Sequence, residues 1–180
     1  YLELLPRIYG IDLDEAVAAG FSCPTTAEEI ALGLFNRFED AYEARMPTLD
    51  PVSEFLRRWL HRNYPRHRTE RTFITYDAFQ FLFAGGHITG LIDFELAQIG
   101  DPLSELAALR IRETIKNLGD LPAIAATWSQ VTGIALDFDV IDFHSVAYNA
   151  NTVLSSAPLI AAPSIGGDLM SHLGWYTNSA

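Results

Sequence analysis

Asp77, Gln80 and Asp93 carry side-chain oxygens and fall around one predicted β-hairpin. We expect residues 79–83 to pair with residues 88–92. That pairing places Gln80 and Asp93 at the open end of the hairpin, with Asp77 one short loop before it. Hard cations such as Mg²⁺ prefer carboxylate and amide oxygens, and a carboxylate held clear of the metal can accept a proton from an attacking hydroxyl. The pattern predicts the minimum equipment for phosphoryl transfer.

A second interpretation of these residues stays open from the pattern alone. Asp and Gln at strand ends are commonly turn-forming or solvated residues. Neither the Asp-x-x-Gln of residues 77–80 nor the Ile-Asp-Phe of residues 92–94 is therefore diagnostic by itself. The Gly-Asp-Pro at residues 100–102 and the apolar helix expected after it favour the functional interpretation.

An apolar hairpin must position these side chains. Residues 72–83 are rich in β-branched and aromatic residues, which favours a strand. Gly85 and Gly86 can supply the positive φ angles of a hairpin turn, and residues 87–95 return as the second strand. We therefore expect a hairpin at about residues 72–93.

Helices are expected on both sides of the hairpin, which makes the predicted fold class α+β and mostly helical. Thr25 or Thr26 can cap one helix, and Asp101 can cap another that has Pro102 at its first position. After an irregular lead and a short helix within residues 1–20, the expected helices are 25–45, 51–63, 101–116, 121–132 and 139–155. The helix at 51–63 has a predicted buried stripe of Phe55, Leu56, Trp59 and Leu60.

The connector HRNYPRHRTER, residues 61–71, is rich in Arg and His. So many basic side chains in a short segment repel one another unless they are exposed or paired. We favour a solvated connector, and a phosphate or substrate contact is the alternative.

The composition limits the possible partners. The chain has 180 residues and a formal net charge of −11 at pH 7, which argues against a nucleic-acid partner. An acidic surface keeps a protein soluble and can also attract cationic ligands. The one cysteine, Cys23, allows no disulfide within the chain, so a reducing cytoplasm is the expected location. No apolar run has the length of a membrane span, and no membrane partner is expected.

The stretch GGHITGLIDFELAQIGDPLSELAALR, residues 85–110, resembles the C-lobe signature of the aminoglycoside phosphotransferase and choline kinase-like family. These are small-molecule kinases with the protein-kinase fold. In that family a catalytic His-Gly-Asp, four residues and Asn precede a hairpin, and Ile-Asp-(Trp/Phe)-Glu, Gly-Asp-Pro and Asp-Leu-Ala follow. The resemblance covers residues 73–112 well and the remainder only in general character, and it implies a protein-kinase-like C-lobe whose hairpin carries the catalytic and metal loops.

The resemblance assigns roles residue by residue. Asp93 matches the metal-binding Asp, Gln80 takes the place of the metal-binding Asn, and Asp77 is the candidate catalytic base. Glu105 stands where the family has the Asp of Asp-Leu-Ala, and Asp101 belongs to the Gly-Asp-Pro. The sequence departs from the family at its catalytic loop, where the His-Gly is missing and the spacing from Asp to the amide residue is shorter.

Four further acidic residues are weaker candidates. Glu95 would stiffen the site or touch the water shell of the metal. Asp137, Asp139 and Asp142 stand at the start of a predicted helix, where capping is the favoured role. In related kinases, acidic residues on C-lobe helices line the acceptor pocket, so these three are also weak candidates for substrate contact.

The sequence therefore predicts an ATP- or GTP-dependent phosphotransferase that uses Mg²⁺ and transfers the γ-phosphate to a hydroxyl of a small acceptor, which the acidic composition would allow to be cationic. Residues 1–180 would form the C-terminal lobe. The nucleotide-clamping N-terminal lobe is expected to lie outside the chain, because the only lysine, Lys116, follows the catalytic loop. Two alternatives are a catalytically inactive kinase-like binding domain and a structural helical domain. The acceptor and the oligomeric state stay open.

Overall fold

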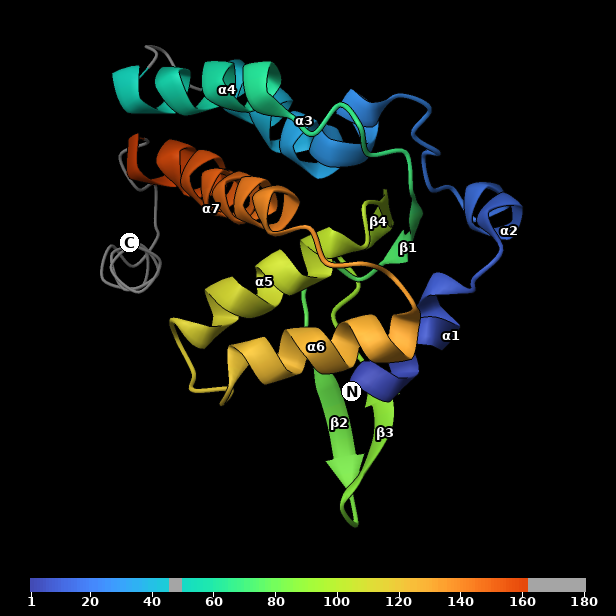
Figure 1. The fold of residues 1–180 in the computed structure, drawn as a ribbon. Helices are drawn as coiled ribbons and strands as arrows, with labels where there is room; N and C mark the ends of the chain where they lie inside the picture. The colour runs from blue at the N-terminus through green and yellow to red at the C-terminus, as the bar shows by residue number, and fades with distance from the viewer. Residues whose placement is uncertain (46–49, 162–180) are drawn as a thin grey trace.

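The computed structural model describes residues 1–45 and 50–161 and shows mostly helices with two small antiparallel sheets (Figure 1). The helices are η1 (Leu2–Leu4), α1 (Leu5–Tyr9), α2 (Leu13–Ala18), α3 (Ala27–Arg45), α4 (Pro51–Asn63), α5 (Leu103–Glu113), α6 (Leu121–Thr132) and α7 (Phe138–Ala161). The strands are β1 (Thr72–Ile74), β2 (Phe81–Ala84), β3 (His87–Leu91) and β4 (Gln98–Gly100). The predicted α+β, mostly helical class is confirmed. The expected irregular lead is wrong, because the chain is helical from Leu2.

The N-terminus of α3 is capped as predicted. Thr26 Oγ1 accepts a hydrogen bond from the backbone N–H of Glu29 at 3.2 Å. The Glu29 carboxylate in turn accepts from the N–H groups of Thr25, at 2.7 Å, and Thr26, at 3.0 Å. This reciprocal arrangement is a capping box, and it satisfies N–H groups that the first turn of a helix leaves without partners.

Helix α4 has its predicted bounds, and its predicted buried stripe is correct for Leu60 but wrong for Phe55. Phe55, expected in the buried stripe, is 66% exposed, whereas Ser53, Arg57 and Leu60 are buried. These three residues recur at helical spacing and so define one face. Arg57 can occupy a buried position because its Nε donates to Glu39 Oε1 of α3 at 2.7 Å.

The single strand predicted over residues 72–83 is wrong. The chain leaves β1 after Ile74 and enters β2 only at Phe81, and β1 pairs with β4 instead of extending the hairpin. Tyr76 and Phe79 have φ angles of 57° and 67°, which break an extended backbone between the two strands. Because the whole segment is rich in β-branched and aromatic residues, its composition does not predict this turn.

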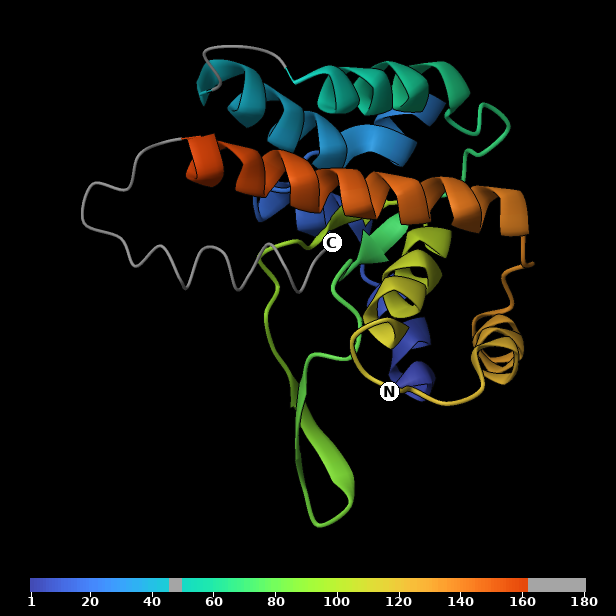
Figure 2. The same ribbon diagram turned by 90° about the vertical axis from the view of Figure 1, so that its left-hand side faces the viewer.

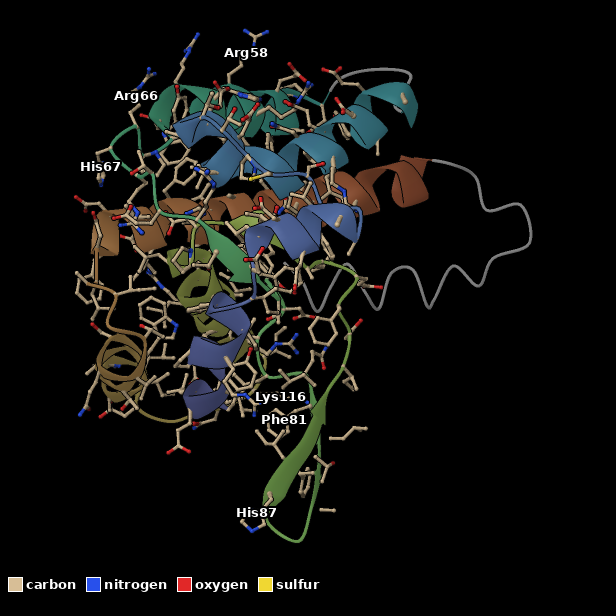
Figure 3. All side chains as sticks on the ribbon, turned by 90° about the vertical axis from the view of Figure 1, so that its right-hand side faces the viewer. Arg58, Arg66, His67, Phe81, His87 and Lys116 are labelled. Atoms are coloured by element: carbon tan, nitrogen blue, oxygen red, sulfur yellow. The ribbon has the colours of Figure 1, made fainter. Side chains whose placement is uncertain are left out.

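The predicted hairpin is present as β2 and β3. Its register pairs Phe81 with Leu91 and Ala84 with His87, and the turn uses Gly85 and Gly86 with φ angles of 57° and 80°. The hairpin projects away from the helices in both ribbon views (Figures 1 and 2), with His87 at its tip (Figure 3).

Helix α7 lies between α3 and α5 and joins the two main apolar clusters. One cluster, between α3, α4 and α7, includes Leu32, Phe35, Leu60, Phe143 and Ala147. The other includes Phe73, Ile99, Leu103, Leu109 and Trp128, and it anchors β1, β4 and α5. Within the described residues, no helix is both long enough and apolar enough to cross a membrane.

Candidate functional site

The predicted trio meets where the hairpin opens. The Gln80 side-chain amide donates hydrogen bonds through Nε2 to Asp77 Oδ2, at 3.1 Å, and to Asp93 Oδ2, at 3.0 Å. The hairpin ladder explains this meeting, because the backbone N–H of Ile92 donates to the carbonyl of Gln80 at 3.1 Å. Asp93 is the next residue along the chain, so it emerges beside Gln80.

The backbone around this trio is unusual. Among the described residues, the non-glycine positions with positive φ are Tyr76, Phe79 and Asp93, the last at 67°. Positive φ is uncommon for side chains with a Cβ and is costly for bulky ones. Such strain persists only where surrounding contacts enforce it, and it gathers at functional sites. Here all three strained positions are in, or directly adjacent to, the trio.

Glu105 of α5 holds the loop that carries Asp77. Its carboxylate is 0% exposed and accepts hydrogen bonds from the Thr75 N–H at 2.5 Å, the Thr75 hydroxyl at 2.9 Å and the Tyr76 N–H at 3.1 Å. Burial raises the pKa of Glu105, and these hydrogen bonds offset only part of that effect. The motif comparison identified Glu105, but no local pattern in the sequence indicated its partners.

Asp101 anchors the base of α5. The buried carboxylate accepts hydrogen bonds from Arg68 Nε and Nη2, both at 2.9 Å, and from the backbone N–H of Leu103 at 3.0 Å. His144 Nε2 lies 3.5 Å from Asp101 Oδ2. Burial acts to raise the pKa of Asp101, but His144 and Arg68 lower it to about 2. Helix α5 begins later than predicted, with Pro102 and not Asp101 at its N-cap position. The Asp101 side chain supports the first turn only through its hydrogen bond from the Leu103 N–H.

The solvated interpretation of the 61–71 connector is wrong for two of its residues. Arg68 is buried in its pair with Asp101. His61 lies 3.0 Å from both Glu28 and Glu39, one at each ring nitrogen. Other members of the segment, Arg66 and His67, are exposed and lie on the far side of the molecule from the hairpin tip (Figure 3).

Arg112, which the sequence did not single out, forms an ion pair with Asp77. The guanidinium donates through Nη2 to Asp77 Oδ1. Tyr1 lies nearby: its ring stacks on Phe79 with 4.6 Å between centroids, and its hydroxyl is 3.5 Å from Thr75 Oγ1. Asp77 is thus reached from the hairpin by Gln80 and from α5 by Arg112.

The weaker candidates do not join the trio. Asp137 caps α7 by accepting from the Val140 N–H at 3.2 Å, and this hydrogen bond lowers its pKa. Asp142 pairs with Arg110, and Asp139 is exposed in the first turn of α7. Glu95 is exposed, and among the described residues none of these four side chains hydrogen-bonds to the trio. Their proposed contacts with a substrate or a metal shell stay predictions.

The donors at the trio suit a hard cation. Asp93 offers a carboxylate and Gln80 an amide oxygen, which are Mg²⁺ ligands when phosphate oxygens or water complete the shell. The Gln80 amide would have to rotate so that its oxygen, not its nitrogen, faces Asp93. Within the described residues, no group of three or more His, Cys, Asp or Glu side chains is arranged to hold a metal ion. The trio therefore provides only a partial shell.

Comparison with known proteins identifies the family to which this chain belongs. The model of the phosphotransferase enzyme family matches residues 12–133, which is more than half of the chain. The chain belongs to this family. The matched region contains Asp77, Gln80, Asp93, Asp101 and Glu105, whereas Asp137, Asp139 and Asp142 lie beyond it. A search of curated proteins found no match.

Proposed function

We propose that the protein is an ATP- and Mg²⁺-dependent phosphotransferase that transfers the γ-phosphate to a hydroxyl of a small acceptor. The observation that carries this proposal is the meeting of Asp77, Gln80 and Asp93 at a strained loop in a chain of the phosphotransferase enzyme family. The proposal includes the kinase-like C-lobe arrangement of residues 1–180.

The trio divides into two functions. Gln80 and Asp93 would hold Mg²⁺, which supplies neutralisation of the phosphate charge when it is bound with the nucleotide. Asp77 would accept the proton of the acceptor hydroxyl, with its carboxylate held next to the proposed metal ligands by the Gln80 amide. In this proposal Asp93 binds the metal and Asp77 acts as the base, so the two carboxylates have different roles.

Glu105 serves this chemistry by fixing the backbone on which Asp77 stands. A catalytic base must keep its position closely, since small displacements of reacting groups greatly reduce rates. The Glu105 carboxylate fastens Thr75 and Tyr76, the residues directly before Asp77, to α5. The lysine that pairs nucleotide phosphates in kinases would come from an N-terminal lobe, because Lys116 follows the loop.

A catalytically inactive binding domain is the second candidate, and two contacts favour it. The Gln80 NH₂ group occupies the space between two carboxylates, where a cation would otherwise balance their charge. Arg112 engages the candidate base directly. The Gln80 contact would have to rearrange before Mg²⁺ could bind between Gln80 and Asp93.

The proposal is tested by titrating Mg²⁺-ATP into the full-length protein and measuring the heat of binding. We expect saturable binding that weakens at least tenfold in Asp93→Asn, a loss of about 1.4 kcal/mol. Asp120→Asn is the matched control, since Asp120 is exposed and caps α6 through the Ala123 N–H. Absence of Mg²⁺-ATP binding, or equal affinity in wild type and Asp93→Asn, would reject the proposal.

A further inference from the structure

Arg112 is only partly engaged by the protein. It lies in the last turn of α5, and its side chain is 24% exposed. Among the described residues, the only hydrogen-bond partner of its guanidinium is Asp77 Oδ1. Arginine has five N–H donors in a rigid fork, so most of the hydrogen-bonding capacity of this group is unused.

Other arginines of the described chain are used differently. Arg68 places two donors on the buried carboxylate of Asp101. Arg57 is surrounded by Glu39, Glu43 and Glu54. The guanidinium groups of Arg68 and Arg57 are engaged by carboxylates of the protein. Arg112, in contrast, faces the candidate site with free donors.

The two oxygens of Asp77 restrict where an acceptor hydroxyl can bind. Oδ1 accepts from Arg112 and Oδ2 accepts from Gln80. Each carboxylate oxygen can accept a second hydrogen bond. A hydroxyl on Oδ2 would crowd the Gln80 amide and the proposed metal position, so Oδ1 is the open choice. A hydroxyl bound there lies next to the guanidinium of Arg112.

We infer that Arg112 selects an acceptor that carries an oxyanion, either a carboxylate or a phosphate, a few bonds from the hydroxyl that Asp77 receives. The guanidinium fork matches both anions with paired N–H donors. Arg112 pairs with Asp77, the proposed base, and not with Asp93, the proposed metal ligand. It therefore lies where the acceptor, and not the metal, would bind. The inference rests on the proposed function in taking Asp77 to face the acceptor.

The charge close to Asp77 favours a different kind of acceptor from the one that the net charge of the chain suggests. The net charge of −11 suggests attraction of cationic acceptors. A cation next to Asp77, however, would meet the fixed positive charge of Arg112 at close range. Burial raises the pKa of Tyr1 to about 12, so its hydroxyl near this site stays protonated and can donate to an anion as well.

The inference is tested by direct binding to the full-length protein, without nucleotide. The probes are glycerate, glycerol 3-phosphate, glycerol and choline, which compare a carboxylate, a phosphate, a neutral and a cationic hydroxyl compound. The variants are Arg112→Gln and the matched control Arg110→Gln, whose side chain is 52% exposed and pairs with Asp142. Protein-detected NMR titration gives the dissociation constants.

We expect at least one of the two anionic probes to bind saturably and to weaken about 10- to 100-fold in Arg112→Gln, as for loss of a charge-assisted hydrogen bond, with no change in Arg110→Gln. The tighter-binding probe of the two, glycerate or glycerol 3-phosphate, identifies whether the site prefers a carboxylate or a phosphate. Failure of both anions to bind, equal affinity in Arg112→Gln, or tighter binding of choline would overturn the inference. Arg112-dependent anion binding without Mg²⁺-ATP binding would establish the anion site at Arg112 but reject the phosphotransferase proposal, and with it the role of Arg112 in selecting an acceptor.

Discussion

Glu105 accepts hydrogen bonds from both the backbone N–H and the hydroxyl of Thr75, a residue 30 positions earlier in the chain. The contact joins α5 to the loop between β1 and β2. It therefore links the helical core to the only loop that carries Asp77 and Gln80. We therefore expect Glu105 to stabilise this loop.

Glu105→Ala leaves the Thr75 and Tyr76 N–H groups buried without acceptors. An unsatisfied buried group costs about 1–3 kcal/mol, so we expect a loss of roughly 2–5 kcal/mol in the free energy of unfolding. Urea denaturation measures it, with Glu3→Ala, at an exposed position, as the control. A loss no larger than that of Glu3→Ala would contradict the bracing role.

The pair of Asp101 and Arg68 predicts an acid-sensitive component of stability. The pKa of Asp101 falls from 3.8 to about 2 on folding. A carboxyl whose pKa is lowered by folding contributes stability above its unfolded pKa and loses it as the pH falls through its folded pKa. We expect Asp101→Asn to remove the part of the pH dependence between about 4 and 2, measured by urea unfolding at a series of acidic pH values. An unchanged slope would contradict the assignment.

The contacts of His61 predict a dependence of stability on pH that has the opposite sign to that of Asp101. Partial burial lowers its pKa, but the carboxylates of Glu28 and Glu39 more than compensate, so the net pKa is raised above 6.5. A group whose pKa is raised by folding contributes stability fully below its unfolded pKa and loses it as the pH rises through its folded pKa. We expect the melting temperature of wild type, relative to His61→Gln, to fall as the pH rises from 6.5 through the raised value. A difference that is constant or grows over this range would show that His61 is not charged between the two carboxylates.

The proposed role of Gln80 as a Mg²⁺ ligand predicts that its replacement raises the Mg²⁺ concentration needed for turnover. Gln80→Met keeps the length of the side chain but removes the amide, so one oxygen donor to the proposed Mg²⁺ is lost. We expect the Mg²⁺ concentration for half-maximal ATP turnover by the full-length protein to rise roughly tenfold, within the range seen when groups supporting a metal are removed. Unchanged Mg²⁺ dependence would place the metal away from Gln80.

Much of this site could be predicted because it depends on local rules. The Gly85-Gly86 turn fixes the hairpin, and the hairpin brings Gln80 beside Asp93. The cap of α3 was likewise predictable, because Thr26 and the Glu29 N–H from which it accepts are three residues apart. In each case the partners are close in sequence or are joined by one tight turn.

The parts that escaped prediction depend on tertiary packing. Arg112 meets Asp77 only because α5 packs beside the loop, and nothing in the sequence near Arg112 indicates this. The solvated connector is the wrong prediction for Arg68 because its partner, Asp101, is 33 residues away in the sequence. The turn between β1 and β2 was missed because Tyr76 adopts a positive φ that its residue type does not favour.

Turnover of Mg²⁺-ATP by the full-length protein and its Asp77→Asn variant, assayed with the anionic and neutral hydroxyl compounds above, tests the central claim most directly. We predict that kcat falls about 10²- to 10⁴-fold in Asp77→Asn, as expected for loss of a general base, while the affinity for Mg²⁺-ATP is unchanged. Equal turnover in wild type and Asp77→Asn would contradict the assignment of Asp77 as the base, and wild type that binds Mg²⁺-ATP without turnover would favour the inactive binding domain.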